Sequence, residues 1–414
     1  MELVALAKRA RVASRQLAQL GEGQKNQALA AMAQALLDYT VDICAANARD
    51  MQNAQANNMP KSTQDRLLLT PARVAGMAGG LRAVMELPDP LSHSDGFFVR
   101  PNGLRMARVR VPLGVIAMIY EARPNVTSDS AALCLKSGNA VILRGGADAI
   151  HSNKAIADVL RGALAASDIN PDAVILIEDT ARETAKQLMG LAGYIDLLIP
   201  RGGAGLIRSV VENARVPVLE TGSGICHTYI EENADLAMAK RIVTNAKLSR
   251  PSVCNAMETL LVDAAIAPDF LPDLCKTLAE LGCEIRGCAI TCKLYAGCVL
   301  ATDADWDTEH GLPILNVRVV GDMDEALAHI EAHSTRHSEA IVTRDYAVAQ
   351  RFHRLVDAAA VYVNASTRFT DGGEFGFGAE IGISTQKIHA RGPVGLRELC
   401  STKTIIFGEG QIRE

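Results

Sequence analysis

The sequence predicts an α/β protein built from two parallel-sheet domains and a small β flap. Three observations support this prediction. Residues 113–219 alternate short apolar strands with helices, and a second alternation of this kind begins at residue 257. Strands separated by helices form βαβ units and therefore parallel sheets. Residues 97–111 instead alternate residue by residue around Asn102-Gly103, a strong hairpin-turn signal.

Composition narrows the class of protein. The chain has 414 residues, enough for two or three domains, and a net charge of −5 with mixed signs, which argues against a nucleic-acid partner. No apolar run reaches the ~18 residues of a transmembrane helix, and the N-terminus lacks a secretory signal. We therefore expect a cytoplasmic protein whose ten cysteines are thiols.

The chain begins with amphipathic helices, because apolar residues recur at three- and four-residue spacing over residues 3–20 and 25–51. A third helix is predicted over residues 62–87. The ribbon at residues 97–111 follows, with arginines and apolar residues on opposite faces. This pattern fits a surface flap, a subunit contact or an ordinary solvated hairpin.

The middle of the chain predicts a parallel sheet. Its strands are expected at residues 113–119, 140–143, 173–177, 197–199 and 216–219. Ligands of such sheets bind at the carboxyl ends of strands. Two of these ends carry an Arg-Gly-Gly run, namely Arg144-Gly145-Gly146 and Arg201-Gly202-Gly203. Glycine lets the backbone approach a ligand and arginine holds phosphate, but G-x-G-x-x-G is absent, so tight turns and a phosphate-bearing cofactor both remain open.

Glu220 follows the last predicted strand of this sheet, within L-E-T-G-S-G. A carboxylate at a strand end can act as a general base. It can equally cap a helix or complete an ion pair, and spacing alone does not choose between these roles.

Cys254 occupies a short polar turn in residues 248–262, between a helix-like run and an apolar strand. Pro251 stops the helix and disfavours helical backbone at Arg250. Arg250 also supplies a cation that favours the nucleophilic thiolate. The alternative is that Cys254 is simply a small buried apolar residue, as most free cysteines are.

The last third predicts a second α/β domain. Strands are expected at residues 257–262, 339–343 and 360–363, and helices at residues 268–281, 322–332 and 346–356. We divide the chain into a cofactor-binding domain (residues 1–98 and 112–225), a catalytic domain (residues 226–385) and a flap with an oligomerisation segment (residues 99–111 and 386–414). Residues 402–407 are expected to add an edge strand to another subunit. Cys254 then lies near a domain junction, where clefts form.

His329, His333 and His337 are spaced four residues apart and would share one face of a continuous helix, as a metal site requires. Ser334 and Thr335 indicate that the helix ends before His337, which favours capping or hydrogen-bonding roles. A cluster of five cysteines lacks C-x-x-C spacing, so we predict core packing and no metal. Residues 386–396 form a basic loop suited to an anionic substrate, or a solvated connection.

In this order, these segments resemble the aldehyde dehydrogenase superfamily over essentially the whole chain. The most specific parts are P-S-V-C-N-A-M-E-T-L-L-V around Cys254 and the histidine segment at residues 326–341. The runs L-E-T-G-S-G-I-C-H and E-F-G-F-G-A-E-I-G add to the resemblance. More narrowly, the chain looks like the branch that reduces γ-glutamyl phosphate in proline biosynthesis, whose own signature the histidine segment resembles.

The resemblance implies roles for single residues. Cys254 matches the nucleophile of the superfamily, and Asn125 is similar to the asparagine whose amide helps to hold the oxyanion. Glu220 falls where the general base lies. Glu309 looks like the glutamate that holds the nicotinamide ribose, and Arg144 stands where the superfamily has a lysine near the adenosine ribose.

Two departures from the superfamily pattern bear on the ligands. Ala147 replaces an acid of NAD-specific relatives, so nothing there would repel a 2′-phosphate and we expect NADPH. The usual Pro-Trp-Asn is Arg123-Pro124-Asn125, which leaves room for a polar substrate. Candidates for binding its carboxylate and phosphate are Arg123, Arg250 and Arg391.

The implied reaction is reduction of L-glutamyl 5-phosphate to L-glutamate 5-semialdehyde and phosphate through a thioester on Cys254. Phosphate, not water, accepts the acyl group in the oxidative direction, so the need for Glu220 stays open. The alternatives are a hydrolytic NAD(P)-dependent semialdehyde dehydrogenase and a non-catalytic, metal-binding regulatory protein. We expect a homo-oligomer without membrane or nucleic-acid partners. Transient contact with glutamate 5-kinase, which makes the labile acyl phosphate, is also plausible.

Overall fold

The computed structural model describes residues 3–92 and 94–413, which divide into two compact units. The first unit contains the described residues up to Thr221, together with Gly376–Gly382 and the residues from Val394 onward. The second contains Gly222–Phe375 and Ile383–Pro393. The prediction grouped residues 386–393 with the flap; they belong to the second unit because Gly392 and Pro393 pair with Ser384 and Ile383 there.

The first unit begins with five helices where the sequence predicts three. They are α1 (Leu3–Leu17), α2 (Glu22–Asp38), α3 (Thr40–Ala56), α4 (Lys61–Leu67) and α5 (Pro71–Glu86). The Thr40 hydroxyl donates hydrogen bonds to the carbonyls of Leu36 and Leu37, which ends α2 and begins α3 at a sharp bend. Pro71 opens α5, a position where its missing N–H costs nothing. No described helix is by itself long and apolar enough to cross a bilayer, and the bent pair α2–α3 passes such a test only jointly.

The predicted parallel sheet of the first unit is present. Its strands are β3 (Val115–Tyr120), β4 (Ala140–Gly145), β5 (Val174–Leu176) and β6 (Leu197–Arg201), in the order β5-β4-β3-β6. Its connecting helices are α6 (Asn125–Lys136), α7 (Ile150–Ala166) and α8 (Arg182–Met189), and α9 (Ala204–Asn213) follows β6. The strand predicted at residues 216–219 is reduced to a single bridge between Leu198 and Val218, since Pro217 has no N–H to donate.

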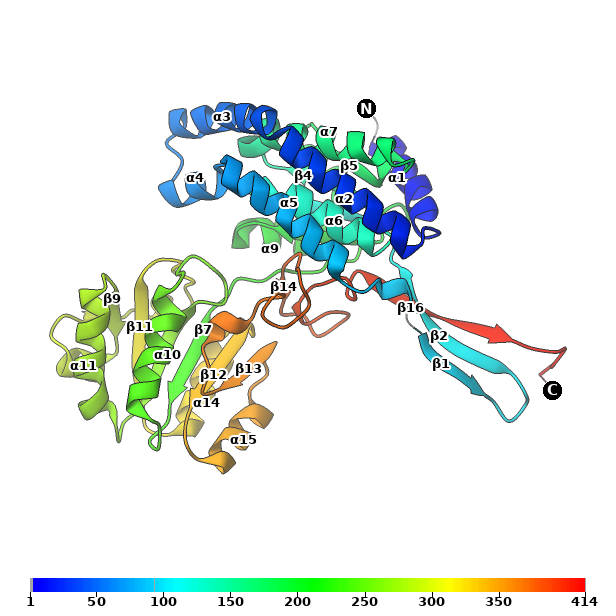
Figure 1. Cartoon of the computed structure of the whole chain (residues 1–414). Helices are drawn as coiled ribbons and strands as arrows, with labels where there is room; N and C mark the ends of the chain where they lie inside the picture. The colour runs from blue at the N-terminus through cyan, green and yellow to red at the C-terminus, as the bar shows by residue number, and fades with distance from the viewer. Residues whose placement is uncertain (1–2, 93, 414) are drawn as a thin grey trace. The chain divides into compact units, whose positions relative to one another are not determined.

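Helices cover this sheet in layers (Figure 1). Helices α2, α3 and α5 pack on α6 and α7, while α1 packs against β3, β4 and β5. All six residues of β3 are buried, as expected for a strand covered on both faces. Strand order reverses between β3 and β6, so the carboxyl ends of these two strands form the topological switch point where such sheets bind ligands.

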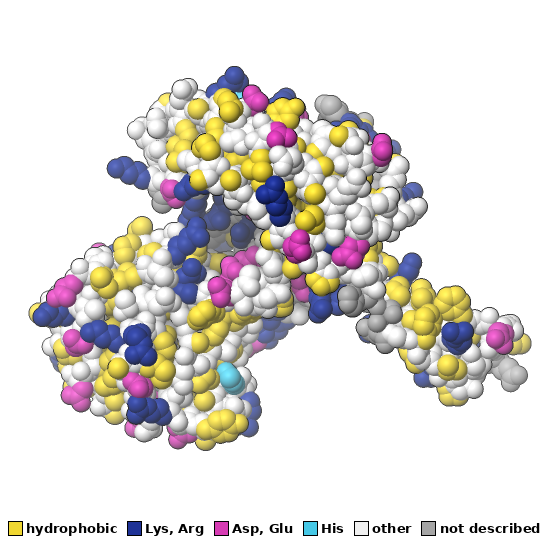
Figure 2. Space-filling model, in the orientation of Figure 1, with side chains coloured by type: hydrophobic (Ala, Val, Ile, Leu, Met, Phe, Trp, Pro, Cys, Tyr) yellow, Lys and Arg dark blue, Asp and Glu magenta, His cyan; other side chains and the backbone are white. Residues whose placement is uncertain are grey.

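The flap also belongs to the first unit. Strand β2 (Arg105–Pro112) pairs antiparallel with β1 (Ser94–Val99) and, along eight residue pairs, with β16 (Cys400–Phe407). Asn102-Gly103 forms the predicted turn, with Gly103 at a φ of +83°. Strand β16 pairs with β2 of its own chain, and the addition of residues 402–407 to a sheet of another subunit stays a prediction. Figure 2 shows hydrophobic side chains on the flap surface; the exposed ones include Phe97, Phe98, Val99, Ile406 and Phe407.

The second unit contains a seven-stranded parallel sheet in the order β10-β9-β11-β8-β7-β12-β13. The strands are β7 (Cys226–Ile230), β8 (Met257–Asp263), β9 (Glu284–Gly287), β10 (Val299–Leu300), β11 (Ile314–Val320), β12 (Ser338–Val342) and β13 (Ala360–Val363). Strands β7, β9, β10 and β11 were not among those predicted. The helices are α10 (Leu236–Leu248), α11 (Ala267–Glu280), α12 (Ala289–Leu294), α13 (Asp303–Trp306), α14 (Met323–His333) and α15 (Tyr346–Leu355).

Side-chain alternation along β8 builds two cores. Leu260 and Val262 pack into a cluster with α10 and α11, whereas Leu261 packs into a second cluster with α14 and α15. Successive side chains of a strand point to opposite faces, so each core lies on its own side of the sheet. The buried sheet is a rigid support for the loops at its two edges.

Candidate functional site

Cys254 lies at the predicted helix-to-strand junction. Helix α10 ends at Leu248 and β8 begins at Met257, and Cys254 is half-buried in the loop between them. Ser249 and Arg250 of the same loop are exposed. The loop therefore presents one partly accessible thiol beside one exposed cation.

This loop lies at the amino ends of the central strands, not at the carboxyl ends where parallel sheets usually bind ligands. Cys226 begins β7 and pairs with Met257, and the neighbouring strand β12 begins at Ser338. Residues that lead into β7, β8 and β12 thus surround Cys254. The sequence alone indicated the junction but not which edge of the sheet would carry it.

The backbone of Cys254 packs against Cys226 and Gly224. The Cys226 thiol donates a hydrogen bond of 3.2 Å to the Cys254 carbonyl. A Cβ added at Gly224 would lie 1.5 Å from that carbonyl oxygen, so only glycine fits there. This explains a glycine of the L-E-T-G-S-G run by close backbone approach.

The side of the loop that follows Cys254 is held by a residue that sequence reasoning missed. Asn255 is buried, and its side chain hydrogen-bonds to the turn η4 (Thr367–Phe369) and to Thr370 beyond it. Arg368 of this turn donates to the Asn255 side chain. No local pattern in the sequence connects positions that lie more than 110 residues apart.

The histidine segment splits as predicted, because α14 ends at His333 and His337 lies beyond it. His337 reaches the Cys226 sulfur at 3.8 Å. His329 is buried among aromatic rings, and burial, together with the nearby His227 and His333, lowers its pKa to about 2. Among residues 3–92 and 94–413, no group of three His, Cys, Asp or Glu side chains is arranged to hold a metal ion.

Glu309 belongs to a loop that is tied to β8, the strand that follows the Cys254 loop. Lys247 and Glu258 form a fully buried ion pair of 2.7 Å between α10 and β8. The second carboxylate oxygen of Glu258 accepts the N–H of Gly311, two residues after Glu309. Burial raises the pKa of Cys226, and the charges of Glu339, Cys254, Glu258 and Glu309 raise it further. Glu309 is therefore within electrostatic range of the amino edge of the sheet.

The first unit has its own candidate edge, at the carboxyl ends of β3, β4 and β6. The Gly203 N–H donates to the Glu121 carboxylate at 3.0 Å. A Cβ at Gly202 would lie 2.4 Å from the same carboxylate, and one at Gly145 would lie 2.1 Å from Asn153 Nδ2. The two Arg-Gly-Gly runs thus end β4 and β6, the two neighbours of β3, and their glycines pack closely against Asn153 and Glu121.

The arginines of this edge have buried, unsatisfied donors. Arg144 donates from Nη2 to the carbonyls of Thr180 and Ala181, while the Nε atoms of Arg144 and Arg201 have no partner among the described residues. Burial lowers the pKa of Arg144, and the charges of Asp179 and Glu121 oppose that effect. Buried orphan donors beside glycine backbones fit a phosphate-bearing ligand.

Asn125 is the first residue of α6 and is exposed. Its amide donates to the Asp129 carboxylate, one turn along the helix, at 2.9 Å. Burial raises the pKa of Asp129 to about 6, against the opposing effects of Asn125 and Arg201. Asp129 therefore orients the amide when it is ionised.

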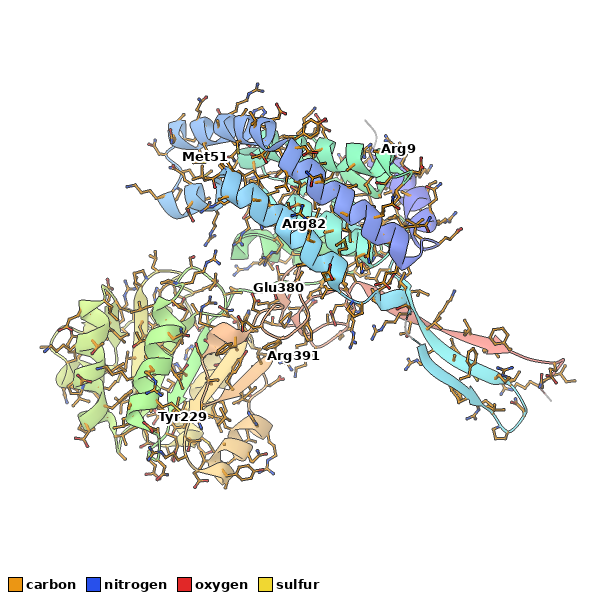
Figure 3. The ribbon with its side chains drawn as sticks, in the orientation of Figure 1. Arg9, Met51, Arg82, Tyr229, Glu380 and Arg391 are labelled. Carbon is orange, nitrogen blue, oxygen red and sulfur yellow. The ribbon has the colours of Figure 1, made fainter. Side chains whose placement is uncertain are left out.

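The remaining candidates differ in their surroundings. Glu220 is half-buried, and the chain leaves the first unit immediately after Thr221. Arg123 is half-buried in the loop before α6. Arg391, labelled in Figure 3, forms an ion pair of 2.7 Å with Asp357, which also binds Lys387. The second unit thus brings together Cys254, Arg250 and Arg368, whereas Arg391 shares the single carboxylate of Asp357 with Lys387 and Arg336.

The chain is similar to known proteins over its whole length. The family model described as "Aldehyde dehydrogenase family" matches residues 2–285. A γ-glutamyl phosphate reductase of Carboxydothermus hydrogenoformans is 57% identical, covering 100% of this chain and 99% of the relative. One from Moorella thermoacetica is 56% identical with the same coverage. The crystal structure of the γ-glutamyl phosphate reductase of Thermotoga maritima matches with a TM-score of 0.97 and 48% identity, over 100% of both chains.

Proposed function

The chain belongs to the aldehyde dehydrogenase family and, within it, to the γ-glutamyl phosphate reductases, and on this basis we propose that it reduces L-glutamyl 5-phosphate to L-glutamate 5-semialdehyde and phosphate. This is a step of proline biosynthesis. The observation that carries the proposal at the level of chemistry is the half-buried Cys254 thiol, held on a braced loop beside Arg250. A thiolate next to a cation is the nucleophile that acyl transfer requires.

In this reaction the Cys254 thiolate attacks the acyl carbon. The carbon–sulfur bond forms, the carbon–oxygen bond to phosphate breaks, and its electron pair leaves with the phosphate oxygen. The product on the protein is a thioester. The oxyanion that forms on the way needs two donors, for which we assign the Cys254 backbone N–H and the Asn125 amide.

The reductant is a nicotinamide cofactor, which supplies the hydride for the thioester carbon when bound. Its phosphates would be held by the Arg-Gly-Gly runs Arg144-Gly145-Gly146 and Arg201-Gly202-Gly203, and its nicotinamide ribose by Glu309. The position of both runs at the carboxyl ends of β4 and β6, and the orphan Nε atoms of Arg144 and Arg201, support this assignment.

We assign NADPH rather than NADH. Ala147 follows the run Arg144-Gly145-Gly146, at the position where an acidic residue would repel a 2′-phosphate, and Arg144 can pair with that phosphate. Asp179 and Glu121 lie within electrostatic range of Arg144 and offset part of that attraction. Comparable kcat/KM values with NADPH and NADH would reject the assignment.

Glu220 is a candidate base only if water attacks the thioester. Here phosphate is the acyl acceptor in the oxidative direction, so the variant Glu220→Gln separates the two chemistries. Loss of phosphate-dependent turnover in this variant would make Glu220 essential to the reductase. Retention of that turnover would leave it a structural carboxylate.

The substrate carries a carboxylate and a phosphate, for which Arg123, Arg250 and Arg391 are the candidates drawn from the sequence. Arg391 is held by Asp357, whereas Arg250 is exposed in the same loop as the thiol, which ranks Arg250 first for the reacting end.

We further propose that the protein works as a cytoplasmic homo-oligomer. All ten cysteines are free thiols, the state that a reducing compartment maintains. Phe97, Phe98 and Phe407 are exposed on the flap, where apolar area favours contact with another subunit. Transient transfer from glutamate 5-kinase would protect the labile substrate, and native subunit mass with and without that kinase tests both statements.

The deciding experiment is NADP⁺ reduction by the semialdehyde with and without phosphate. Turnover should require phosphate, and Cys254→Ala should retain less than about 1% of it, since covalent catalysis is worth many powers of ten. Turnover without phosphate would point instead to a hydrolytic semialdehyde dehydrogenase. Turnover that survives in Cys254→Ala would reject the nucleophile.

A further inference from the structure

A turn from near the end of the second unit wraps the residue that follows the thiol. The Thr367 hydroxyl donates to the Asn255 carbonyl at 2.7 Å, and the Asn255 amide donates to the Thr370 carbonyl at 2.9 Å. Arg368 Nη1 donates to the Asn255 side-chain oxygen. Asn255 is 5% exposed, so these bonds form in a shielded environment.

The guanidinium of Arg368 is fixed from both ends of the nucleophile loop. Its Nε donates to the Ser249 hydroxyl at 3.0 Å, before the thiol, and its Nη1 donates to Asn255, after it. Both acceptors are neutral, so neither cancels the positive charge. Arg391 differs in this respect, because its guanidinium is paired with the Asp357 carboxylate.

The charged groups near Arg368 include a second arginine and the Cys254 sulfur. Burial lowers the pKa of Arg368 and the charge of Arg250 lowers it further, whereas Cys254 and Asp371 raise it. Arg250, the Cys254 sulfur and the Asp371 carboxylate are therefore all within electrostatic range of Arg368. Adjacent like charges repel, and an anion placed between them relieves the repulsion.

The proposed substrate supplies such an anion at the required place. An acyl phosphate carries its phosphoryl group one oxygen atom from the carbon that the thiolate attacks. A cation within electrostatic range of the sulfur is also within range of this leaving group. Arginine binds phosphate through two parallel N–H donors, and a guanidinium whose plane is already fixed loses less entropy on binding.

We propose that Arg368, with Arg250 as the second cation, binds the phosphoryl group of the acyl phosphate beside Cys254. Arg368 stabilises the phosphate as the carbon–oxygen bond breaks and its electron pair moves to the leaving oxygen. The same site holds inorganic phosphate in the reverse direction. This inference rests on the proposed function and adds a residue that was not among the arginines drawn from the sequence.

The first test needs no turnover. The rate at which iodoacetamide alkylates Cys254 is measured against inorganic phosphate concentration in the wild-type chain, in Arg368→Gln and in the control Arg241→Gln, an exposed arginine of α10. Phosphate should slow alkylation in the wild type and control. In Arg368→Gln the phosphate concentration for half protection should rise about tenfold or more, the value of a charge-assisted hydrogen bond.

The second test uses turnover. In the oxidative direction, Arg368→Gln should raise the KM for phosphate about tenfold to a hundredfold while changing the KM for the semialdehyde less than about twofold. Arg368→Lys keeps the charge but cannot bridge Ser249 and Asn255. Its KM for phosphate should therefore lie between those of the wild type and Arg368→Gln. If thermal melting shows that the glutamine variant does not fold, the lysine variant decides by the same comparison.

The two proposals fail separately. If wild-type turnover needs phosphate but the Arg368 variants keep the wild-type half-protection concentration and phosphate KM, the inference is wrong and the proposed function stands. If the wild-type chain shows no phosphate-dependent turnover, the proposed function is wrong. Loss of phosphate protection in the Arg368 variants would even then establish an anion site at the thiol.

Discussion

The thiol of Cys226 donates its hydrogen bond to the carbonyl oxygen of Cys254, at 3.2 Å from sulfur to oxygen. One cysteine thus supports the backbone of the other, and the His337 ring lies 3.8 Å behind the supporting sulfur. Together with Gly224, this contact fixes the depth at which the loop rests on β7. The position of Cys254 is therefore set by residues behind its backbone, namely Cys226 and Gly224.

Adding a methyl group at Gly224 should displace this loop. In Gly224→Ala the new Cβ would lie 1.5 Å from the Cys254 carbonyl oxygen, which is backbone and cannot swing away. We expect a loss of about 2 to 4 kcal/mol in unfolding free energy, or a correspondingly distorted and inactive loop. Urea unfolding and kcat measure the two outcomes.

The matched control is Gly162→Ala in α7, where a Cβ meets nothing within 4 Å. It should stabilise the protein by about 0.5 to 1 kcal/mol, because alanine is the better helix former. Equal effects of the two substitutions would contradict the close approach at Gly224.

Alkylation should distinguish the two adjacent cysteines. Burial and the charge of Glu339 raise the pKa of Cys226 well above the ordinary thiol value, so at pH 8 it should remain unmodified by iodoacetamide while Cys254 reacts. Peptide mass mapping identifies which cysteines are alkylated. Early labelling of Cys226 would mean that it is far less enclosed than the structure indicates.

A second reactive thiol provides the control for that experiment. Burial would raise the pKa of Cys288, but hydrogen bonds from Thr291 and from the Val319 N–H outweigh it and lower the pKa. Cys288 should therefore label as well, and Cys288→Ser should leave turnover and its sensitivity to iodoacetamide unchanged.

The buried pair Lys247–Glu258 should couple strongly. Lys247→Met leaves a buried carboxylate without its cation and should cost about 3 to 5 kcal/mol. The double variant Lys247→Met/Glu258→Gln keeps an acceptor for the Gly311 N–H and should recover most of that loss. Urea unfolding of both single variants and the double variant completes the cycle, and additive losses would show that the pair does not interact.

Stability should fall on acidification because of His329. Its pKa is near 6.5 in the unfolded chain and about 2 in the folded one, so between these values only the unfolded state binds the proton. Unfolding free energy should therefore decrease as pH falls below about 6.5, by about 1.4 kcal/mol per pH unit from this residue. His337, whose pKa burial lowers to about 4, adds to the loss down to that pH.

His329→Phe removes this titration while keeping a ring of similar shape. Urea unfolding from pH 7 to pH 5 should give a shallower loss in this variant than in the wild type. Parallel pH profiles would indicate that His329 takes up a proton in the folded state.

The sequence predicted the elements whose cause is local. The end of α14 before His337 follows from Ser334 and Thr335, and the turn of the flap follows from Asn102-Gly103. The loop that carries Cys254 follows from the break in the helix imposed by Pro251.

Features with non-local causes were missed. The sequence predicted α2 and α3 as a single helix, because no glycine or proline marks the bend before Thr40. Arg368 was not selected because its link to Asn255 spans 113 residues and leaves no periodic trace. The edge of the sheet that carries Cys254 likewise depends on strand order, which pairing rather than composition determines.

Strand β16 has a consequence for the order in which the polypeptide matures during translation. The first unit starts near the N-terminus, yet it lacks a partner for one side of β2 until Cys400–Phe407 have left the ribosome. Almost all of the second unit is synthesised before that moment and can already be folded. Free chains truncated after residue 395 should therefore protect the second sheet from protease while β1 and β2 remain cleavable.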